Sequence, residues 1–126
     1  MIPETLFYTK EHEWIKIEGQ TATIGITDHA QSQLGEITFV ELPSADQEIK
    51  AHGILGTVES AKAASDIFSS LPGKIIEVNS VLETEPELMN KDCYNAGWLC
   101  KLQITDSNSM EDLMNARQYE EYLNQD

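Results

Sequence analysis

The chain has 126 residues, a length that fits one domain and can bury a hydrophobic core without support from disulfides or a metal. Its 8 basic and 22 acidic residues give a formal net charge of −14 at pH 7. This charge repels phosphate groups, which argues against nucleic-acid-binding and membrane-surface proteins and favours partners with basic docking patches.

The N-terminal residues lack the basic start and apolar run of a secretion signal, and no stretch is long enough to cross a bilayer. We therefore expect a cytoplasmic, monomeric protein with a single domain over residues 1–126. Two cysteines, Cys93 and Cys100, have a spacing that matches neither a zinc site nor a redox pair. We expect both to be free thiols, with Cys100 on the buried face of a strand.

Short segments rich in β-branched and aromatic residues recur along the chain and predict strands. They cover residues 14–17, 21–26, 37–42, 54–59, 74–78 and 98–104. Turn residues, in particular glycine and proline, occupy 18–20, 43–46, 71–73 and 95–97. This density of short strands indicates a mainly β domain, either a sandwich or a flattened barrel.

The pattern also predicts two helices. Thr27 or Asp28 can cap a short internal helix that runs to Leu34, where Gly35 supplies a left-handed residue that ends it. A C-terminal helix is predicted over about 109–124, because Ser109 and Asp112 have approximately the spacing of a capping box. Its apolar face, which we expect to dock on the sheet, holds Leu113, Ala116, Tyr119 and Leu123.

Lys62 lies near the middle of a run of small residues, ESAKAASD, at positions 59–66. The pattern predicts an exposed lysine at the tip of a hairpin within about 54–78, with its amine on a four-carbon stem clear of bulky neighbours. A modifying enzyme needs this presentation, but in most proteins an exposed lysine is only a solvated surface residue. Spacing alone does not decide between these interpretations.

Several further motifs stand in a fixed order around this segment. They are HEW at 12–14, GITDHAQ at 25–31, LGEI at 34–37, FVELP at 39–43, VESAKAASD at 58–66, Gly73, EVN at 77–79 and GWL at 97–99. In this order the chain, from about Tyr8 to Tyr119, resembles the H proteins of the glycine cleavage system. The segment at 58–66 resembles their lipoylation motif.

This resemblance implies a mainly β, lipoyl/biotinyl-type hybrid of barrel and sandwich, with a short internal helix and a C-terminal helix. It also implies lipoate joined through an amide to Lys62. In such proteins the lipoyl disulfide accepts an aminomethyl group from glycine decarboxylase, and a folate-dependent aminomethyltransferase removes the one-carbon unit. Dihydrolipoyl dehydrogenase then reoxidises the dithiol. The protein is thus a carrier and a substrate of its partners, which also include a lipoate-attaching enzyme.

By the same resemblance, Glu13 and Asp66 correspond to acidic residues that contact the loaded arm. The chain departs from the family pattern at Glu11, where serine or threonine is usual, and Glu11 adds a carboxylate to the segment that helps line this cleft. Cys93 replaces a common proline, and Leu71-Pro72 replaces a small polar pair. None of these departures touches Lys62.

Two alternatives compete with this interpretation. A lipoyl-relay carrier would pass lipoate to 2-oxoacid dehydrogenases instead of serving glycine cleavage, and a purely structural β domain would carry no lipoate. A biotin carrier is disfavoured, because its lysine normally lies between methionines and Lys62 lies between alanines. An enzyme has little support, since the sequence contains no nucleophile elbow, phosphate loop or metal-ligand spacing among its three histidines.

Overall fold

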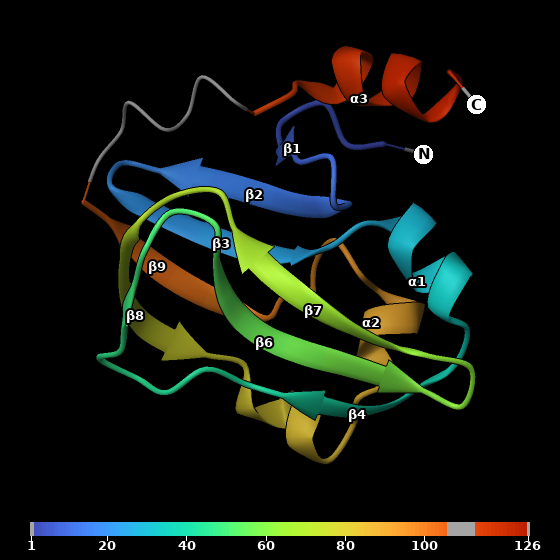
Figure 1. Ribbon diagram of the computed structural model, residues 1–126, viewed down its shortest axis with the longest axis horizontal. Helices are drawn as coiled ribbons and strands as arrows, with labels where there is room; N and C mark the ends of the chain where they lie inside the picture. Colours follow the sequence, from blue (N-terminus) through green and yellow to red (C-terminus); the bar gives the residue numbers. More distant parts are fainter. Residues whose placement is uncertain (1, 106–112, 126) are drawn as a thin grey trace.

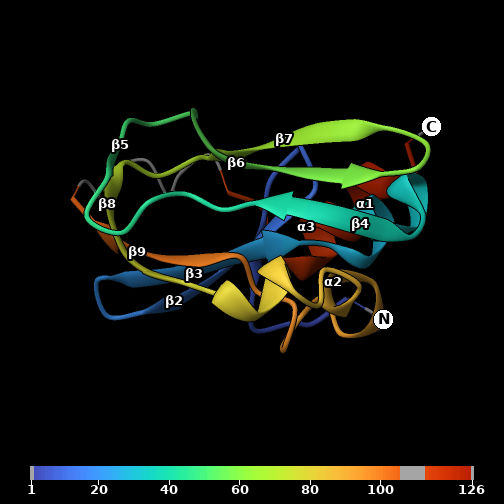
Figure 2. The same ribbon diagram turned by 90° about the horizontal axis from the view of Figure 1, so that it is seen from below.

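The computed structural model describes residues 2–105 and 113–125, which form two antiparallel sheets stacked as layers (Figures 1 and 2). The three-stranded sheet has the order β4 (Ile37–Glu41), β6 (Gly53–Ser60) and β7 (Ala64–Ser69). The six-stranded sheet has the order β1 (Phe7–Tyr8), β2 (Glu13–Glu18), β3 (Thr21–Ile26), β9 (Cys100–Ile104), β8 (Gly73–Val78) and β5 (Glu48–Ile49). Within these two ranges, four short helices flank the sheets: α1 (Asp28–Leu34), the 3₁₀ helix η1 (Ser80–Glu83), α2 (Leu88–Lys91) and α3 (Ala116–Leu123).

The main core lies between the two sheets, because alternate strand residues point inward from each layer. Ile24 and Leu102 on one sheet and Val58 on the other are fully buried. Cys100 belongs to this core, and both cysteines are buried free thiols, as predicted. Burial raises the pKa of the Cys100 thiol to about 12, so this group stays protonated at neutral pH.

All six predicted strands are present, with differences at their ends. The last strand begins at Cys100 rather than at residue 98. A strand with Cys100 on its buried face would have Leu99 on its outer face, but Leu99 is fully buried. The hairpin that contains Lys62 ends at Ser69, because β8 pairs with β5 and β9 in the other sheet. The range of about 54–78 predicted for this hairpin was therefore too long.

The internal helix agrees with its prediction. The Thr27 side chain caps α1 by accepting a hydrogen bond from the Ala30 N–H at 3.2 Å. Gly35 follows Leu34 with φ +80° and ψ −156°, a region that only glycine adopts readily. The sequence predicted a left-handed residue at this position. The φ of Gly35 is positive, as predicted, but its ψ places it outside the left-handed helical region.

The predicted start of the C-terminal helix was wrong. Helix α3 begins at Ala116, and its capping box consists of Asn115 and Gln118. Met114 is extended and pairs with Tyr8 through two backbone hydrogen bonds of 2.8 Å, which excludes a helix at this position. Ser109 and Asp112 lie outside the described residues.

Helix α3 packs at the β1–β2 edge of the six-stranded sheet (Figure 1). Tyr119 stacks on Tyr8 with ring centroids 4.7 Å apart, in a second hydrophobic cluster that also contains Trp14. The docking on a sheet that the sequence predicted is thus observed. Among the described residues, no helix is both long and apolar enough to span a bilayer.

Candidate functional site

Lys62 occupies the turn between β6 and β7, at the end of the three-stranded sheet next to α1 (Figure 1). Ser60 organises the turn: its N–H donates to the Ala63 carbonyl at 2.8 Å, and its hydroxyl accepts from the N–H groups of Lys62 and Ala63 at 3.2 Å. Lys62 and its alanine neighbours are exposed, as predicted. The turn therefore holds the lysine backbone while leaving its amine accessible.

The Lys62 side chain passes close to Gly35 at the end of α1. A methyl group placed on Gly35 would lie 3.2 Å from Lys62 Cδ, so the glycine leaves room for the lysine stem. Beside it, α1 and α2 border an open depression of about 840 Å³. The depression is lined by Gln31, Ser32, Gly35, Glu36, Glu87, Asn90 and Lys91. The sequence does not predict this surface, because the surface depends on how α2 packs.

Asp66 lies four residues beyond Lys62, on the outer face of β7. Its side chain is exposed and accepts a hydrogen bond from the Thr57 hydroxyl on the paired strand at 3.1 Å. The carboxylate is thus oriented by its cross-strand partner and keeps acceptor sites open to solvent.

Glu13 is almost completely buried, with 1% of its surface exposed. Its Oε1 accepts a hydrogen bond from the Thr9 hydroxyl at 2.8 Å, and its Oε2 accepts one from the Phe68 N–H at 3.0 Å. The second bond satisfies a backbone donor on the free edge of β7, so Glu13 connects the two sheets. Burial raises the Glu13 pKa to about 7, although both hydrogen bonds lower it, and Glu11 adds a smaller upward contribution.

A tight bend turns the Glu13 side chain inward. The Thr9 N–H donates to the Glu13 carbonyl at 3.0 Å, and His12 adopts a positive φ of 67°. The exposed Glu11 lies in the same bend. Strand β7 contacts both carboxyl groups. Asp66 lies on its outer face, two residues before Phe68, and the Phe68 N–H donates to Glu13.

The bend is attached to α3 and α1 by a chain of side-chain hydrogen bonds. His12 Nδ1 lies 2.7 Å from the Tyr119 hydroxyl, which lies 2.8 Å from the Thr27 hydroxyl. The His12 ring also packs on His29 with centroids 4.4 Å apart. Burial and His29 lower the His12 pKa, against an upward effect of Glu11. The sequence does not predict this series of hydrogen bonds, although His12, Thr27 and Tyr119 each belong to a predicted motif or helix.

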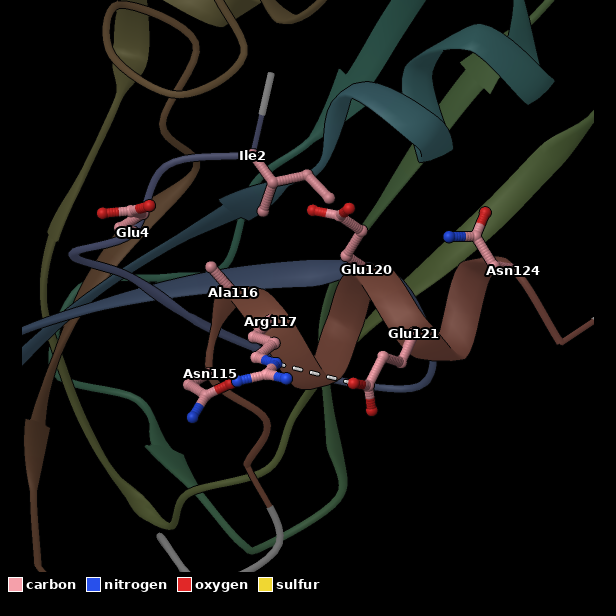
Figure 3. A pocket seen from close by; sticks show the side chains of 8 residues that line it. All are labelled: Ile2, Glu4, Asn115, Ala116, Arg117, Glu120, Glu121 and Asn124. Atoms are coloured by element: carbon pink, nitrogen blue, oxygen red, sulfur yellow. Dashed lines mark ion pairs between the residues drawn. The ribbon is translucent and has the colours of Figure 1, made fainter.

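A second hollow, of about 540 Å³, lies between the N-terminal segment and α3 (Figure 3). An ion pair of 3.6 Å joins Arg117 and Glu121 on one side of it. None of Lys62, Glu13, Asp66 or Glu11 lines this hollow. Over residues 2–105 and 113–125, no group of three or more His, Cys, Asp or Glu side chains is arranged to hold a metal ion.

Comparison with known proteins identifies the family. A family model described as "Glycine cleavage H-protein" matches residues 6–126. The chain belongs to this family. It is 49% identical over 119 residues to the glycine cleavage system H protein of Thermotoga maritima, covering 94% of this chain and 96% of the relative. It is 46% identical over 122 residues to that of Staphylococcus saprophyticus, covering 97% of both chains.

The crystal structure of a glycine cleavage system H protein from Mycobacterium marinum is similar throughout. The TM-score is 0.89 at 35% identity, over 97% of this chain and 98% of that one. The expected barrel-sandwich hybrid is therefore confirmed. The protein is the lipoyl aminomethyl shuttle of the glycine cleavage system, a carrier rather than a catalyst. Its family carries a lipoyl-lysine. Membership in this system implies three partners: the P protein (glycine decarboxylase), the T protein (aminomethyltransferase) and the L protein (dihydrolipoyl dehydrogenase).

Proposed function

We propose that Lys62 is the lysine that carries lipoate, through an amide at Nζ. The observation that supports this best is its position on an exposed turn between alanines, with the stem running past Gly35. Lipoate attachment requires a primary amine that an enzyme can enclose, and this turn presents one. When bound, lipoate supplies the disulfide that accepts the aminomethyl group.

The residues around Lys62 have separate tasks in this proposal. Ser60 fixes the turn through the hydrogen bonds of its backbone N–H and its hydroxyl, so that the arm always leaves the same point of the surface. Gly35 lets the stem lie against α1. Tethering the reactive group to a docked protein gives it a high effective concentration at each partner's active site.

Asp66, Glu13 and Glu11 form the proposed cleft for the loaded arm. Asp66 is the accessible carboxylate on β7, and Glu11 adds exposed negative charge beside Glu13. Glu13 uses only two of the approximately four acceptor positions of a carboxylate, so a cationic amine that reaches it can bind without displacing Thr9 or Phe68. A cation near Glu13 would also favour its ionised form.

We further propose how the protein is modified and which enzymes it then meets. A lipoate-attaching enzyme modifies Lys62, and the carrier then meets glycine decarboxylase, the aminomethyltransferase and dihydrolipoyl dehydrogenase as a monomer in the cytoplasm. A monomer suits a shuttle, because the same turn has to enter several different active sites in succession.

Mass spectrometry of protein from a lipoylating host tests the assignment. We expect a single lipoyl group, which peptide mapping places on Lys62. Lys62→Arg should lose the modification and keep the wild-type unfolding transition, because the side chain is exposed and buries little surface. Lys74→Arg, a matched change on an exposed β8 lysine, should remain fully lipoylated. Lipoate on any other lysine, or on the Lys62→Arg variant, would refute the proposal.

A further inference from the structure

The side chain of Asn90, on α2, makes three hydrogen bonds to α1 and to the segment that joins α1 to β4. Its Oδ1 accepts from the Ile37 N–H at 2.8 Å, and its Nδ2 donates to the Gly35 carbonyl and to Gln31 Oε1, both at 2.8 Å. Only one orientation of the amide fits these partners, because the N–H group requires an acceptor and the carbonyl requires a donor. Asn90 therefore holds the backbone on both sides of residue 36.

The segment that Asn90 holds supports the Lys62 turn in two ways. A methyl group placed on Gly35 would lie 3.2 Å from Lys62 Cδ, so the lysine stem runs close to this residue. Ile37, the first residue of β4, pairs with Ser60, whose hydroxyl organises the turn. Figure 1 shows α1, α2 and the start of β4 at the same end of the molecule as the turn. Asn90 thus acts on the stem contact and on the strand pairing together.

The backbone of this segment depends on the Asn90 bonds for its conformation. Gly35 has φ +80° and ψ −156°, and a glycine has wide conformational freedom, so its carbonyl direction is set by the donor that binds it. The register of β4 shifts between Ile37 and Phe39, and such a bulge interrupts the ladder next to the turn. Ile37 is also buried, and its N–H would lose its partner without Asn90.

We propose that Asn90 is a positioning residue for lipoate attachment: through Gly35 and Ile37 it fixes the direction in which the Lys62 stem leaves the surface. This inference rests on the proposed attachment of lipoate to Lys62. An enzyme that modifies the lysine has to bind the turn in one conformation, and a turn that already has it loses less entropy on binding. When the competent conformation is populated only in part, the apparent affinity falls by that fraction. Asn90 therefore acts on KM rather than on kcat.

A matched pair of variants separates this role from a general effect on stability. Asn90→Ala removes the three bonds. Asn79→Ala is the control, because the Asn79 amide also holds backbone and donates to the Ala96 and Trp98 carbonyls at 2.9 and 2.8 Å, in the loop before β9. A third variant, Asn90→Asp, keeps an acceptor for the Ile37 N–H and removes both donors. Thermal unfolding first shows which variants are folded, and Asn90→Asp carries the test if Asn90→Ala does not fold.

The kinetic test measures lipoate attachment with the lipoate-free carrier as the varied substrate of the lipoate-attaching enzyme. We expect Asn90→Ala to raise the KM for the carrier by roughly fivefold or more, with kcat within about twofold of wild type. Asn90→Asp should act in the same direction, because the Gly35 carbonyl loses its donor. Asn79→Ala should stay within about twofold of wild type in both constants. Equal KM effects at the two asparagines, or a fall in kcat alone, would overturn the proposal.

Backbone amide NMR of the lipoate-free carrier provides a readout that is independent of the enzyme. The order parameters of residues 60–63 should fall in Asn90→Ala and remain at wild-type values in Asn79→Ala. A turn that is as rigid in Asn90→Ala as in the wild type would also refute the role of Asn90. If the wild type accepted no lipoate on Lys62, the proposed function itself would fail, whereas a lipoylated wild type with unaffected Asn90 variants would refute only this inference.

Discussion

Glu13 is a buried carboxyl group that stabilises the fold through two hydrogen bonds and destabilises it through its charge. The bond to the Phe68 N–H satisfies a donor that would otherwise be buried without a partner at the edge of β7. The cost of burying the charge raises the Glu13 pKa to about 7. Glu13 thus changes its ionisation within the physiological pH range.

The first prediction concerns the pH dependence of stability. Because the folded-state pKa of Glu13, about 7, exceeds the ordinary value of 4.5 for a glutamate, the contribution of Glu13 to stability is complete below about pH 4.5 and is lost as the pH rises through 7. The loss is on the order of 3 kcal/mol. Glutamine cannot ionise, so Glu13→Gln should remove this pH-dependent loss of stability. Urea unfolding of both proteins from pH 4 to pH 8 measures the difference. Parallel stability profiles for wild type and variant would contradict the prediction.

The second prediction concerns the lifetime of the aminomethyl-loaded carrier. A carboxylate that holds a cationic amine in a partly desolvated site contributes about 1.5–3 kcal/mol, so its loss should weaken binding roughly tenfold or more. We expect Glu13→Gln to accelerate the release of formaldehyde and ammonia from isolated loaded protein and to leave lipoylation intact. Glu11→Ser should act in the same direction but less, because Glu11 is exposed. Equal release rates for wild type and Glu13→Gln would exclude this role.

The sequence was sufficient to predict the exposure of Lys62, but not the environment of Glu13. Small residues around a lysine between two strands form a local signal, and the turn agrees with it. The burial of Glu13 depends on a backbone N–H 55 residues away, at a strand edge that exists only after both sheets have assembled. No local pattern around Glu13 records that contact.

At the scale of elements, a buried tyrosine of α3 connects this helix with two distant segments. The Tyr119 hydroxyl lies between His12 Nδ1 and the Thr27 hydroxyl, and burial raises its pKa to about 12. Thr27 also caps α1. A single side chain of the C-terminal helix therefore connects the start of α1 with the bend that contains Glu11 and Glu13.

The third prediction is that Tyr119→Phe loosens this connection. Removing the hydroxyl leaves His12 and Thr27 without one partner while the stacking on Tyr8 is kept, so stability should fall by about 1–2 kcal/mol. Hydrogen exchange should become faster in α3 and in the 9–13 bend. Tyr122→Phe is the matched control, since its hydroxyl makes only a 3.4 Å contact with the Lys10 carbonyl, and it should change stability by less than about 0.5 kcal/mol. The same loss in both variants would refute the role of Tyr119.

Elements with a strong local signal were predicted well, and elements that depend on tertiary pairing were not. Short runs of β-branched and aromatic residues between turn residues identified β2, β3, β4, β6, β8 and β9, and Thr27 and Gly35 delimited α1. The two-residue strands β1 and β5 are too short for a detectable period. The start of α3 was misplaced because Met114 is extended and pairs with Tyr8, so the helix begins only at Ala116.

At the scale of the whole molecule, 22 acidic residues exceed 8 basic ones, and ion pairs within the chain leave the net charge of −14 unchanged. In the described part of the chain, four cations pair with carboxylates: Lys16, Lys74, Lys101 and Arg117. These pairs are exposed, with N–O distances between 3.6 and 4.0 Å, and pairs of this kind contribute little to stability. The remaining negative charge produces a field that extends beyond the surface and acts on approaching proteins.

The last prediction is that this field accelerates encounters with the decarboxylase. At about 0.05 M salt the field reaches farther than at 0.5 M, where the Debye length falls to a few ångströms. The association rate should therefore fall several-fold over this range, and turnover at saturating carrier should change less, because the chemical step is independent of long-range steering. Stopped-flow association at several salt concentrations measures the first quantity, and steady-state kinetics measures the second. Glu48→Lys, which makes the net charge less negative by two on β5, should slightly reduce the slope of log rate against log salt. An association rate that does not change with salt would exclude steering and leave the acidic surface with a role in solubility alone.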